Sequence, residues 1–128
     1  MRVLITGGCG FIGNHVVRRI LLIPGIERVV NVDALTYSGN LDNCNDIIDK
    51  RYRFVHGNIN NKPAMDQIIE DEEISVIIHL AAESHVDRSI NSVQPFVETN
   101  IDGTRILLES ITDSETSGRP IHFIHVST

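Results

Sequence analysis

The stretch Ile5-Thr6-Gly7-Gly8-Cys9-Gly10-Phe11-Ile12-Gly13 decides how this chain folds. Residues 2–5 before it are mostly apolar and predict a short strand, whereas the spacing of apolar residues after position 11 predicts a helix. The glycines therefore lie at a strand-to-helix turn. We expect Gly7 to permit the sharp turn, Gly10 to let backbone amides approach a phosphate, and Gly13 to let the helix lie close to the strand.

Asp33 stands twenty positions after Gly13, at the end of the next apolar segment. At a turn of this kind the helix N-terminus can bind the pyrophosphate of a dinucleotide, and an acid at this distance can accept hydrogen bonds from the adenosine ribose. A carboxylate would repel a 2′-phosphate, and Ala34 offers no cation to hold one, so the pattern predicts NAD rather than NADP. The alternative that Asp33 is a solvated acid at the start of a turn stays open.

Apolar strands alternate with helical patterns along the rest of the chain. The alternation predicts an α/β fold, a Rossmann-type doubly wound parallel sheet, and right-handed crossovers predict the strand order 3-2-1-4-5. The carboxyl ends of the first and fourth strands, residues 7–10 and 80–84, should then flank a binding crevice. Strands are predicted over residues 2–5, 28–32, 52–56, 75–80 and 121–126, and helices over 11–22, 41–50, 63–71 and 92–112.

The composition fits one globular domain over residues 1–128, with 41% apolar and 22% charged residues. A net charge of −6 argues against nucleic acid or an anionic membrane as a partner. The apolar runs are too short to span a bilayer, so we expect a cytoplasmic protein. Cys9 and Cys44 show no metal-ligand spacing and are expected to be free thiols. No metal site is predicted.

Three further segments carry a resemblance: Asp-Ala-Leu-Thr-Tyr-Ser-Gly-Asn-Leu at 33–41, Leu-Ala-Ala-Glu-Ser-His-Val-Asp-Arg-Ser-Ile at 80–90, and His-Val-Ser-Thr at 125–128. Together with the glycine turn they resemble the dTDP-glucose 4,6-dehydratases of the extended short-chain dehydrogenase/reductase superfamily. The glycine turn and residues 79–82 are shared with related epimerases, whereas residues 83–90 and 35–40 are closer to the dehydratases. The resemblance covers the whole chain, but such enzymes are more than twice as long.

The resemblance implies a set of site residues. Ser84 and Thr128 are implied on the substrate side, with Thr128 contacting the sugar 4-hydroxyl. Asn58 departs from the usual aspartate at its position; its amide oxygen can still accept a hydrogen bond, and it can also simply follow a strand end. The implied cofactor contacts are Phe11 and Ile12 at the pyrophosphate, Asp33, Ala34, Leu35 and Thr36 at the ribose, Asn58 and Ile59 at the adenine, Leu80, Ala81, Ala82, Glu83 and Ser84 at the nicotinamide half, and Thr99.

The implied activity is an NAD-dependent lyase reaction on a nucleotide sugar, dTDP-glucose, giving a 4-keto-6-deoxy sugar in a homodimeric enzyme. The chain lacks the Tyr-x-x-x-Lys pair of the family, since Tyr37 and Tyr52 are not followed by lysine four positions later. We expect that pair beyond Thr128, and no turnover by this chain alone. A related sugar-nucleotide epimerase or decarboxylase, or a non-catalytic NAD-binding module, remains an alternative.

Two groups of polar residues are expected to have structural roles. His79 ends a buried strand and is expected to be a satisfied core histidine rather than a base. His85, Asp87 and Arg88 are expected to shape a loop. The helix over residues 92–112 is expected, by resemblance, to contribute to a dimer interface.

Overall fold

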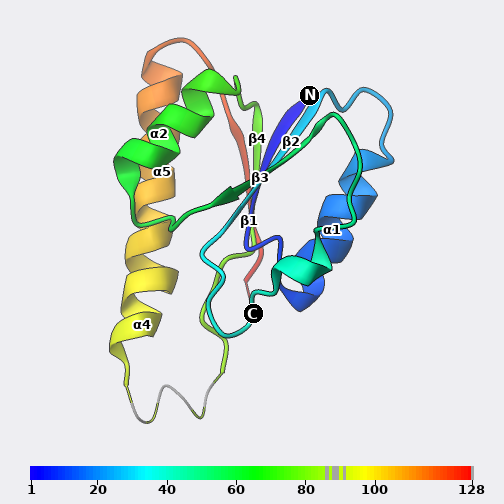
Figure 1. The fold of residues 1–128 in the computed structure, drawn as a ribbon. Coiled ribbons are helices and arrows are strands. Elements are labelled where there is room, and N and C mark those ends of the chain that lie inside the picture. The colour runs from blue at the N-terminus through cyan, green and yellow to red at the C-terminus, as the bar shows by residue number, and fades with distance from the viewer. Residues whose placement is uncertain (86, 88–89, 91, 128) are drawn as a thin grey trace.

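The computed structural model describes residues 1–85, 87, 90 and 92–127. Its centre is a parallel sheet in which the strands lie in the order β3-β2-β1-β4-β5, as the sequence predicts (Figure 1). Each strand begins and ends within two residues of its predicted bounds. The strands are β1 (Arg2–Thr6), β2 (Arg28–Asp33), β3 (Tyr52–His56), β4 (Val76–His79) and β5 (His122–His125).

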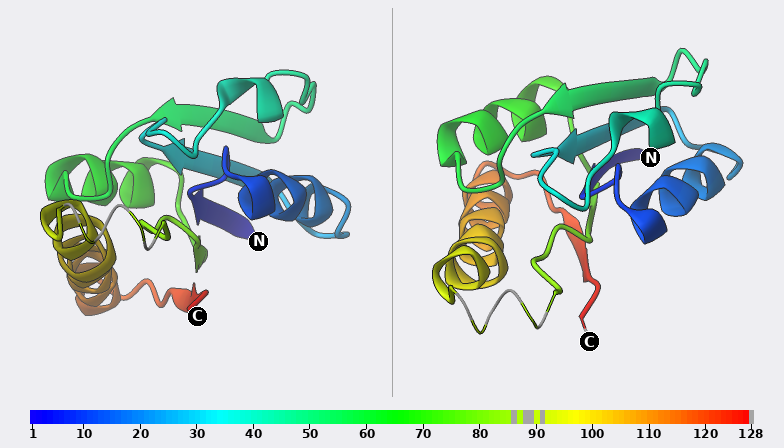
Figure 2. Two further views of the ribbon diagram at one scale, coloured as in Figure 1. Left: turned by 90° about the horizontal axis from the view of Figure 1, so that it is seen from below. Right: turned by 60° about the horizontal axis from the view of Figure 1, so that its bottom comes forward.

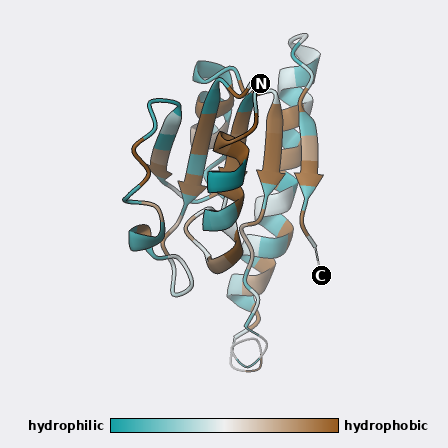
Figure 3. Cartoon of the chain, turned by 90° about the vertical axis from the view of Figure 1, so that its right-hand side faces the viewer, coloured by the Kyte–Doolittle hydropathy of each residue, from teal (hydrophilic) through white to brown (hydrophobic). Residues whose placement is uncertain are grey.

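Helices cover both faces of this sheet. The helix α1 (Phe11–Leu21) lies on one face, and α2 (Lys62–Asp71) and α5 (Thr104–Thr116) lie on the other (Figures 1 and 2). Successive side chains of a strand point to opposite faces, so Val3 and Ile5 pack toward α1 whereas Leu4 packs toward α2 and α5. The strands are correspondingly apolar along most of their length (Figure 3).

The predicted helix over residues 41–50 is wrong. Only one 3-10 turn forms there, η1 (Leu41–Asn43), and the chain continues in turns to β3. Short polar side chains explain the difference, because they bind nearby backbone amides and replace helical hydrogen bonds. The Asn40 side chain accepts from the amide of Asp42 at 3.0 Å, and the Asp49 side chain accepts from the amide of Arg51 at 2.8 Å.

The predicted helix over residues 92–112 consists of three consecutive segments in the structure. A short α4 (Gln94–Phe96) leads into a π-helical segment, η2 (Val97–Gly103), and α5 then extends to Thr116. In η2, Gly103 packs directly on Ile59, where a Cβ would lie 2.4 Å from the Ile59 Cδ1 atom. Widened turns of this type are frequent at functional sites, and η2 supplies Thr99 and Asn100 to the site described below.

The amino edge of the sheet carries a buried carboxylate that the sequence analysis did not identify. Glu72, which follows α2, accepts from Arg28 Nε at 2.6 Å and also pairs with Arg53 and, at 3.9 Å, with Arg2. These arginines come from β1, β2 and β3. The hydrogen bonds and charges of Arg28, foremost, and of Arg53 lower the pKa of Glu72 to about 2. The carboxylate therefore joins three strands at the edge opposite the candidate site.

Candidate functional site

Three loops emerge together at the carboxyl edge of the sheet. The amide of Gly7 donates to the carbonyl of Val32 at 2.9 Å, and the amide of Leu80 donates to the carbonyl of Thr6 at 3.1 Å. These bonds extend the β1–β2 and β1–β4 pairing by one residue. Residues 7–10 and 80–84 consequently begin next to one another, as the strand order predicted, and residues 34–40 begin on the other side of the glycine turn.

The glycine turn is packed so tightly that a Cβ at Gly7 or Gly13 would collide with backbone atoms. Gly7 has a φ of +75°, and a Cβ there would lie 2.7 Å from the amide nitrogen of Ala81. A Cβ on Gly13 would lie 2.1 Å from the carbonyl oxygen of Gly7. The positive φ of Gly7 confirms its expected role in the turn, and the lack of a Cβ lets Gly13 pack against that turn. The close approach of Gly7 to Ala81, on the loop after β4, is a further role that the sequence did not reveal.

The start of α1 presents backbone donors. Gly10 is the N-cap, and within the described residues no side chain caps this helix and no acid lies in its first turn. The first amides of a helix have no acceptor inside it, so those of Phe11, Ile12 and Gly13 offer donors and a partial positive charge. The Gly10 amide is used within the turn, where it donates to the Gly7 carbonyl at 3.2 Å.

The side chains of Phe11 and Ile12 point away from this turn. They are 83% and 61% exposed, and with His15 and Ile20 they line a hollow of about 310 Å³ on the outer face of α1. Only their backbone amides are placed for the predicted pyrophosphate contact. Asn14 stabilises the same turn, because its side-chain amide donates to the carbonyl of Gly10 at 2.9 Å.

Asp33 is buried and connects the glycine turn to the loop after β2. Its Oδ2 atom accepts from the amide of Cys9 and its Oδ1 atom from the amide of Leu35, each at 2.8 Å. Leu35 has a φ of +51°, a conformation that side-chain-bearing residues rarely adopt. A carboxylate oxygen can accept more than one hydrogen bond, so Asp33 retains capacity for a ligand. It is thus held in place by the backbone rather than solvated.

The other residues expected near the adenosine differ in their placement. Thr36 is exposed, and half-buried Ala34 offers its carbonyl to His56 Nε2 at 3.2 Å. The Asn58 side-chain oxygen accepts from the amide of Asn60 at 2.9 Å. Ile59 is buried in the core with side chains of α2 and α5, so its side chain packs inside the domain rather than facing the candidate site. Thr99 is half-buried in η2.

The segment after β4 is held by a residue that the sequence analysis missed. The side chain of Asn100, in η2, accepts from the amide of Glu83 at 2.8 Å and donates to its carbonyl at 2.9 Å. Leu80 and Ala81 are half-buried, whereas Ala82 and Ser84 are exposed at the edge. The signal in the sequence that could have identified Asn100 is an asparagine within an otherwise helical pattern. Thr128 and Arg88 lie outside the described residues.

His79 is a satisfied core histidine, as expected. It is buried, with Nδ1 2.7 Å from the Thr6 hydroxyl oxygen and Nε2 3.0 Å from that of Thr104. Burial, and to a lesser extent the electrostatic effect of the neighbouring His125, lowers the pKa of His79 to about 4. The ring is therefore neutral at physiological pH.

The two cysteines are free, as expected, and both are buried. Both sulfur atoms lie near the side-chain amide nitrogen of Asn31, at 3.6 Å for Cys9 and 3.8 Å for Cys44. Burial, followed by the neighbouring Cys44, raises the pKa of Cys9 to about 12. A thiol that stays protonated is a poor nucleophile and a poor metal ligand. The described residues also contain no cluster of three or more metal-ligating side chains.

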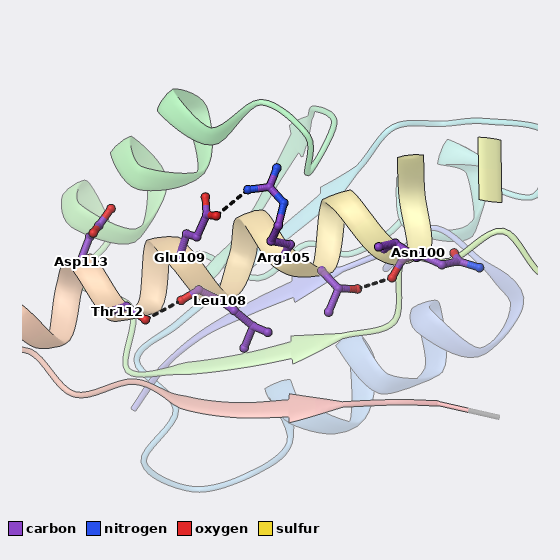
Figure 4. Close-up of a pocket in the computed structure, with 8 residues that line it drawn as sticks. Asn100, Arg105, Leu108, Glu109, Thr112 and Asp113 are labelled. Atoms are coloured by element: carbon purple, nitrogen blue, oxygen red, sulfur yellow. Dashed lines mark hydrogen bonds and ion pairs between the residues drawn. The ribbon is translucent and has the colours of Figure 1, made fainter. Parts of the chain in front are cut away.

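A larger hollow, of about 570 Å³, lies on the outer face of η2 and α5 rather than at the glycine turn (Figure 4). It is open and partly apolar, with Ile101 61% exposed and Leu108 46% exposed. The ion pair between Arg105 and Glu109 lies along the same face. The turn at the carboxyl edge has the donors and the acceptor of the predicted cofactor site, whereas this hollow is lined by exposed apolar side chains beside an ion pair.

Among the described residues, no helix combines the length and the hydrophobicity needed to cross a membrane.

Comparison with known proteins agrees with this geometry. The family model described as GDP-mannose 4,6 dehydratase matches residues 4–128. The dTDP-glucose 4,6-dehydratase 1 of Escherichia coli strain K12 is 47% identical over all of this chain, which spans 37% of that protein. A dTDP-glucose 4,6-dehydratase from Streptomyces venezuelae, solved with NAD bound, is 43% identical with a TM-score of 0.83 over 90% of this chain and 37% of that one.

A UDP-glucose 4-epimerase from Thermotoga maritima, solved with UDP-glucose, is 34% identical with a TM-score of 0.83, over 100% of this chain and 38% of that one. The chain thus spans little more than a third of the relatives that it matches. Its sequence matches the family model almost from end to end, and its fold is that of the solved members. The chain belongs to the GDP-mannose 4,6 dehydratase family, with dTDP-glucose 4,6-dehydratases among its relatives.

Proposed function

We propose that residues 1–128 form the NAD-binding domain of a dTDP-glucose 4,6-dehydratase. One observation carries the proposal: the uncapped first turn of α1 and the buried carboxylate of Asp33 occur at the same edge of the sheet. The first offers donors for a pyrophosphate and the second an acceptor for ribose hydroxyls. Relatives named as dTDP-glucose 4,6-dehydratases are 42–47% identical over the whole chain, and solved dTDP-glucose 4,6-dehydratases contain NAD.

The residues present fit this cofactor. Position 13 has no room for a side chain, because a Cβ there would collide with Gly7, so glycine keeps the backbone of the turn uncovered. The amides of Phe11 and Ile12 begin a helix that has no side-chain cap to compete with a ligand. NAD would supply an acceptor, and later a donor, of hydride. The chain's own part is to hold the two phosphates with backbone amides, to bind the ribose with Asp33, and to border the nicotinamide half with residues 80–84.

For the whole protein we propose dTDP-glucose as the substrate. Ser84 is exposed at the carboxyl edge, where it can reach a bound sugar, and Thr128 is proposed to contact the sugar 4-hydroxyl. Proton transfer needs a group positioned at that hydroxyl, and the Tyr-x-x-x-Lys pair of the resemblance does not occur in these residues. We therefore expect no turnover from this chain by itself, and detection of a 4-keto-6-deoxy sugar with the purified chain would contradict this.

The binding proposal is tested by calorimetric titration with NAD and NADP. Asp33→Ala should weaken NAD binding and narrow the preference for NAD over NADP, because both the ribose acceptor and the charge that repels a 2′-phosphate are removed. Asp71→Ala, which removes an acid at the end of α2, is the matched control and should leave both affinities unchanged. Folded chain that shows no affinity for NAD at millimolar concentration would refute the proposal.

We also propose that the outer face of η2 and α5 is a homodimer surface. Ile101 and Leu108 expose apolar side chains along it, and such a patch is typical of association sites (Figure 4). Ile101→Asp should shift the chain toward monomer in sedimentation experiments. Ile48→Asp is the control, since Ile48 is 99% exposed in the loop before β3. A wild-type chain that stays monomeric at high concentration would count against this surface.

A sugar-nucleotide epimerase is the second candidate, because the Thermotoga maritima epimerase has the same fold at 34% identity. The two candidates differ in their products. A longer polypeptide containing this segment should give a 4-keto-6-deoxy sugar nucleotide if it is a dehydratase and a sugar nucleotide inverted at C4 if it is an epimerase.

A further inference from the structure

A continuous chain of hydrogen bonds runs through His79 beneath the candidate site. The amide of Ala81 donates to the Thr6 hydroxyl at 3.3 Å, and that hydroxyl lies 2.7 Å from His79 Nδ1. On the other side of the ring, Nε2 lies 3.0 Å from the hydroxyl of Thr104, which donates to the carbonyl of Asn100 at 2.8 Å. This series of hydrogen bonds links β1 and β4 to the consecutive helical segments η2 and α5, and the strands and helices meet only in the folded protein.

Counting protons gives the direction of every bond in this chain. Thr104 has one hydroxyl proton and donates it to the carbonyl of Asn100, so its oxygen must accept from His79 Nε2–H. The ring is neutral, so its Nδ1 carries a lone pair and accepts from the Thr6 hydroxyl. The Thr6 oxygen then accepts from the Ala81 amide. Only the tautomer with a proton on Nε2 satisfies all four bonds.

The two ends of this series of hydrogen bonds both hold the loop formed by residues 81–83. Thr6 fixes the amide of Ala81, while the side chain of Asn100 fixes both backbone groups of Glu83. The backbone position of Asn100 is in turn tied to Thr104. Ala81 is also the residue against which Gly7 packs, so a movement of this loop would be transmitted to the glycine turn.

We propose that His79, as the neutral Nε2–H tautomer, is a positioning residue that aligns the backbone of residues 81–83 with the glycine turn. Its effect on cofactor affinity rests on the proposed function, whereas its tautomer and its effect on the loop do not. Among the described groups, the titratable side chain that faces the ring is His125 of β5, with the ring centroids 5.1 Å apart, and Phe123 of the same strand stacks on it at 6.0 Å.

The first test is the ring ¹⁵N spectrum of the folded 128-residue chain. We expect an unprotonated Nδ1 and a protonated Nε2 for His79 at neutral pH. A proton on Nδ1, or a rapidly averaging ring, would overturn the inference. This readout needs no ligand, so it stands even if the chain fails to bind NAD.

The second test compares Thr104→Val, which removes the hydroxyl at nearly constant volume, with Thr104→Ser, which keeps it. Thr104→Val should shift the amide resonances of Ala81 and Glu83 and weaken NAD binding about tenfold, the equivalent of one net hydrogen bond. Thr104→Ser should keep both the amide resonances and the NAD affinity close to those of the wild type. The control is Thr112→Val on the exposed face of the same helix, whose hydroxyl donates to the Leu108 carbonyl at 3.0 Å.

These outcomes separate the inference from the proposed function. A wild-type chain that does not bind NAD refutes the proposed function, and the amide shifts then test the positioning role alone. Amide resonances of Ala81 and Glu83 that are unchanged in Thr104→Val, or a Thr104→Ser variant that behaves like valine, would refute the positioning role. If Thr104→Val does not fold, the ring ¹⁵N spectrum of Thr104→Ser is the test of the inference. The retained hydroxyl must preserve the Nε2–H tautomer of His79, and a proton on Nδ1 in this variant would refute the inference.

Discussion

Replacing Gly13 with alanine tests the packing on which the candidate site depends. Alanine is the better helix former by about 1 kcal/mol, so a Gly→Ala change within an exposed helix normally stabilises a protein. At position 13 the new Cβ would lie 2.1 Å from the carbonyl oxygen of Gly7 and 2.7 Å from the Cα of Gly8. Both partners are backbone atoms, so the clash cannot be relieved by rotating a side chain.

The expected magnitude follows from these distances. An ordinary carbon contact needs about 3.5 Å, so the start of α1 must move away from the turn by more than about 1 Å. Overpacking of this kind costs about 1–3 kcal/mol, and the rigid backbone partner places Gly13→Ala at the upper end. After the helix-propensity gain, we expect a net loss of about 2 kcal/mol in the free energy of unfolding, equivalent to roughly 5–10 °C in Tm.

The assay is urea denaturation of Gly13→Ala beside Gly57→Ala, followed by NAD titration of both. Gly57 is the matched control because a Cβ there would meet the side chains of Val32 at 3.6 Å and Val55 at 3.8 Å, both ordinary contacts. The control should change stability by less than about 0.5 kcal/mol. The first variant should also bind NAD more weakly, since the amides of Phe11 and Ile12 move with the helix. Equal stability and equal affinity of the two variants would show that this reasoning is wrong.

Two further predictions concern buried groups. Glu72→Gln should lower the free energy of unfolding at pH 7 by about 3 kcal/mol, because it leaves Arg28 and Arg53 without their carboxylate. In the wild type the pKa of Glu72 is lowered to about 2, so its contribution is fully present above about pH 4.5 and is lost as the pH falls toward 2. Urea denaturation between pH 7 and pH 2.5 should show this loss in the wild type only, and identical pH profiles would contradict it. Cys9 and Cys44 should resist alkylation by iodoacetamide in the native chain and react in urea, because both are buried and the Cys9 pKa is raised to about 12. Labelling of native chain at the rate of a free thiol would contradict that burial.

Much of the fold followed from local patterns. The strands are short apolar runs, and the residues that separate them carry turn or helix signals, so element types and the strand order could be predicted. The prediction of a helix failed for residues 41–50, where short polar side chains compete for the backbone amides. Asn40 and Asp49 bind their own neighbouring backbone, which a periodicity argument does not consider.

The candidate site could be predicted from the sequence only in part. Gly7, Gly13 and Asp33 could be identified because their roles depend on the local turn and on a fixed distance along the chain. The partners of Asp33 could not, because the carboxylate is held by the amides of Cys9 and Leu35, and backbone amides leave no mark in a sequence. The resemblance also named Phe11, Ile12 and Ile59, but the structure directs their side chains outward or into the core.

The sequence by itself determined a strand, a bare glycine turn and a helix whose N-terminus presents its amides, because sterics and hydrogen bonding act there over a few residues. Only the tertiary structure decided what meets that turn. Thr6 and His79 are 73 positions apart, and Asn100 reaches Glu83 across 17 positions, so their contacts exist only once the parallel strands and the π segment are in register. Long-range pairing of this kind depends on the whole fold, whereas the glycine turn depends on the chain next to it.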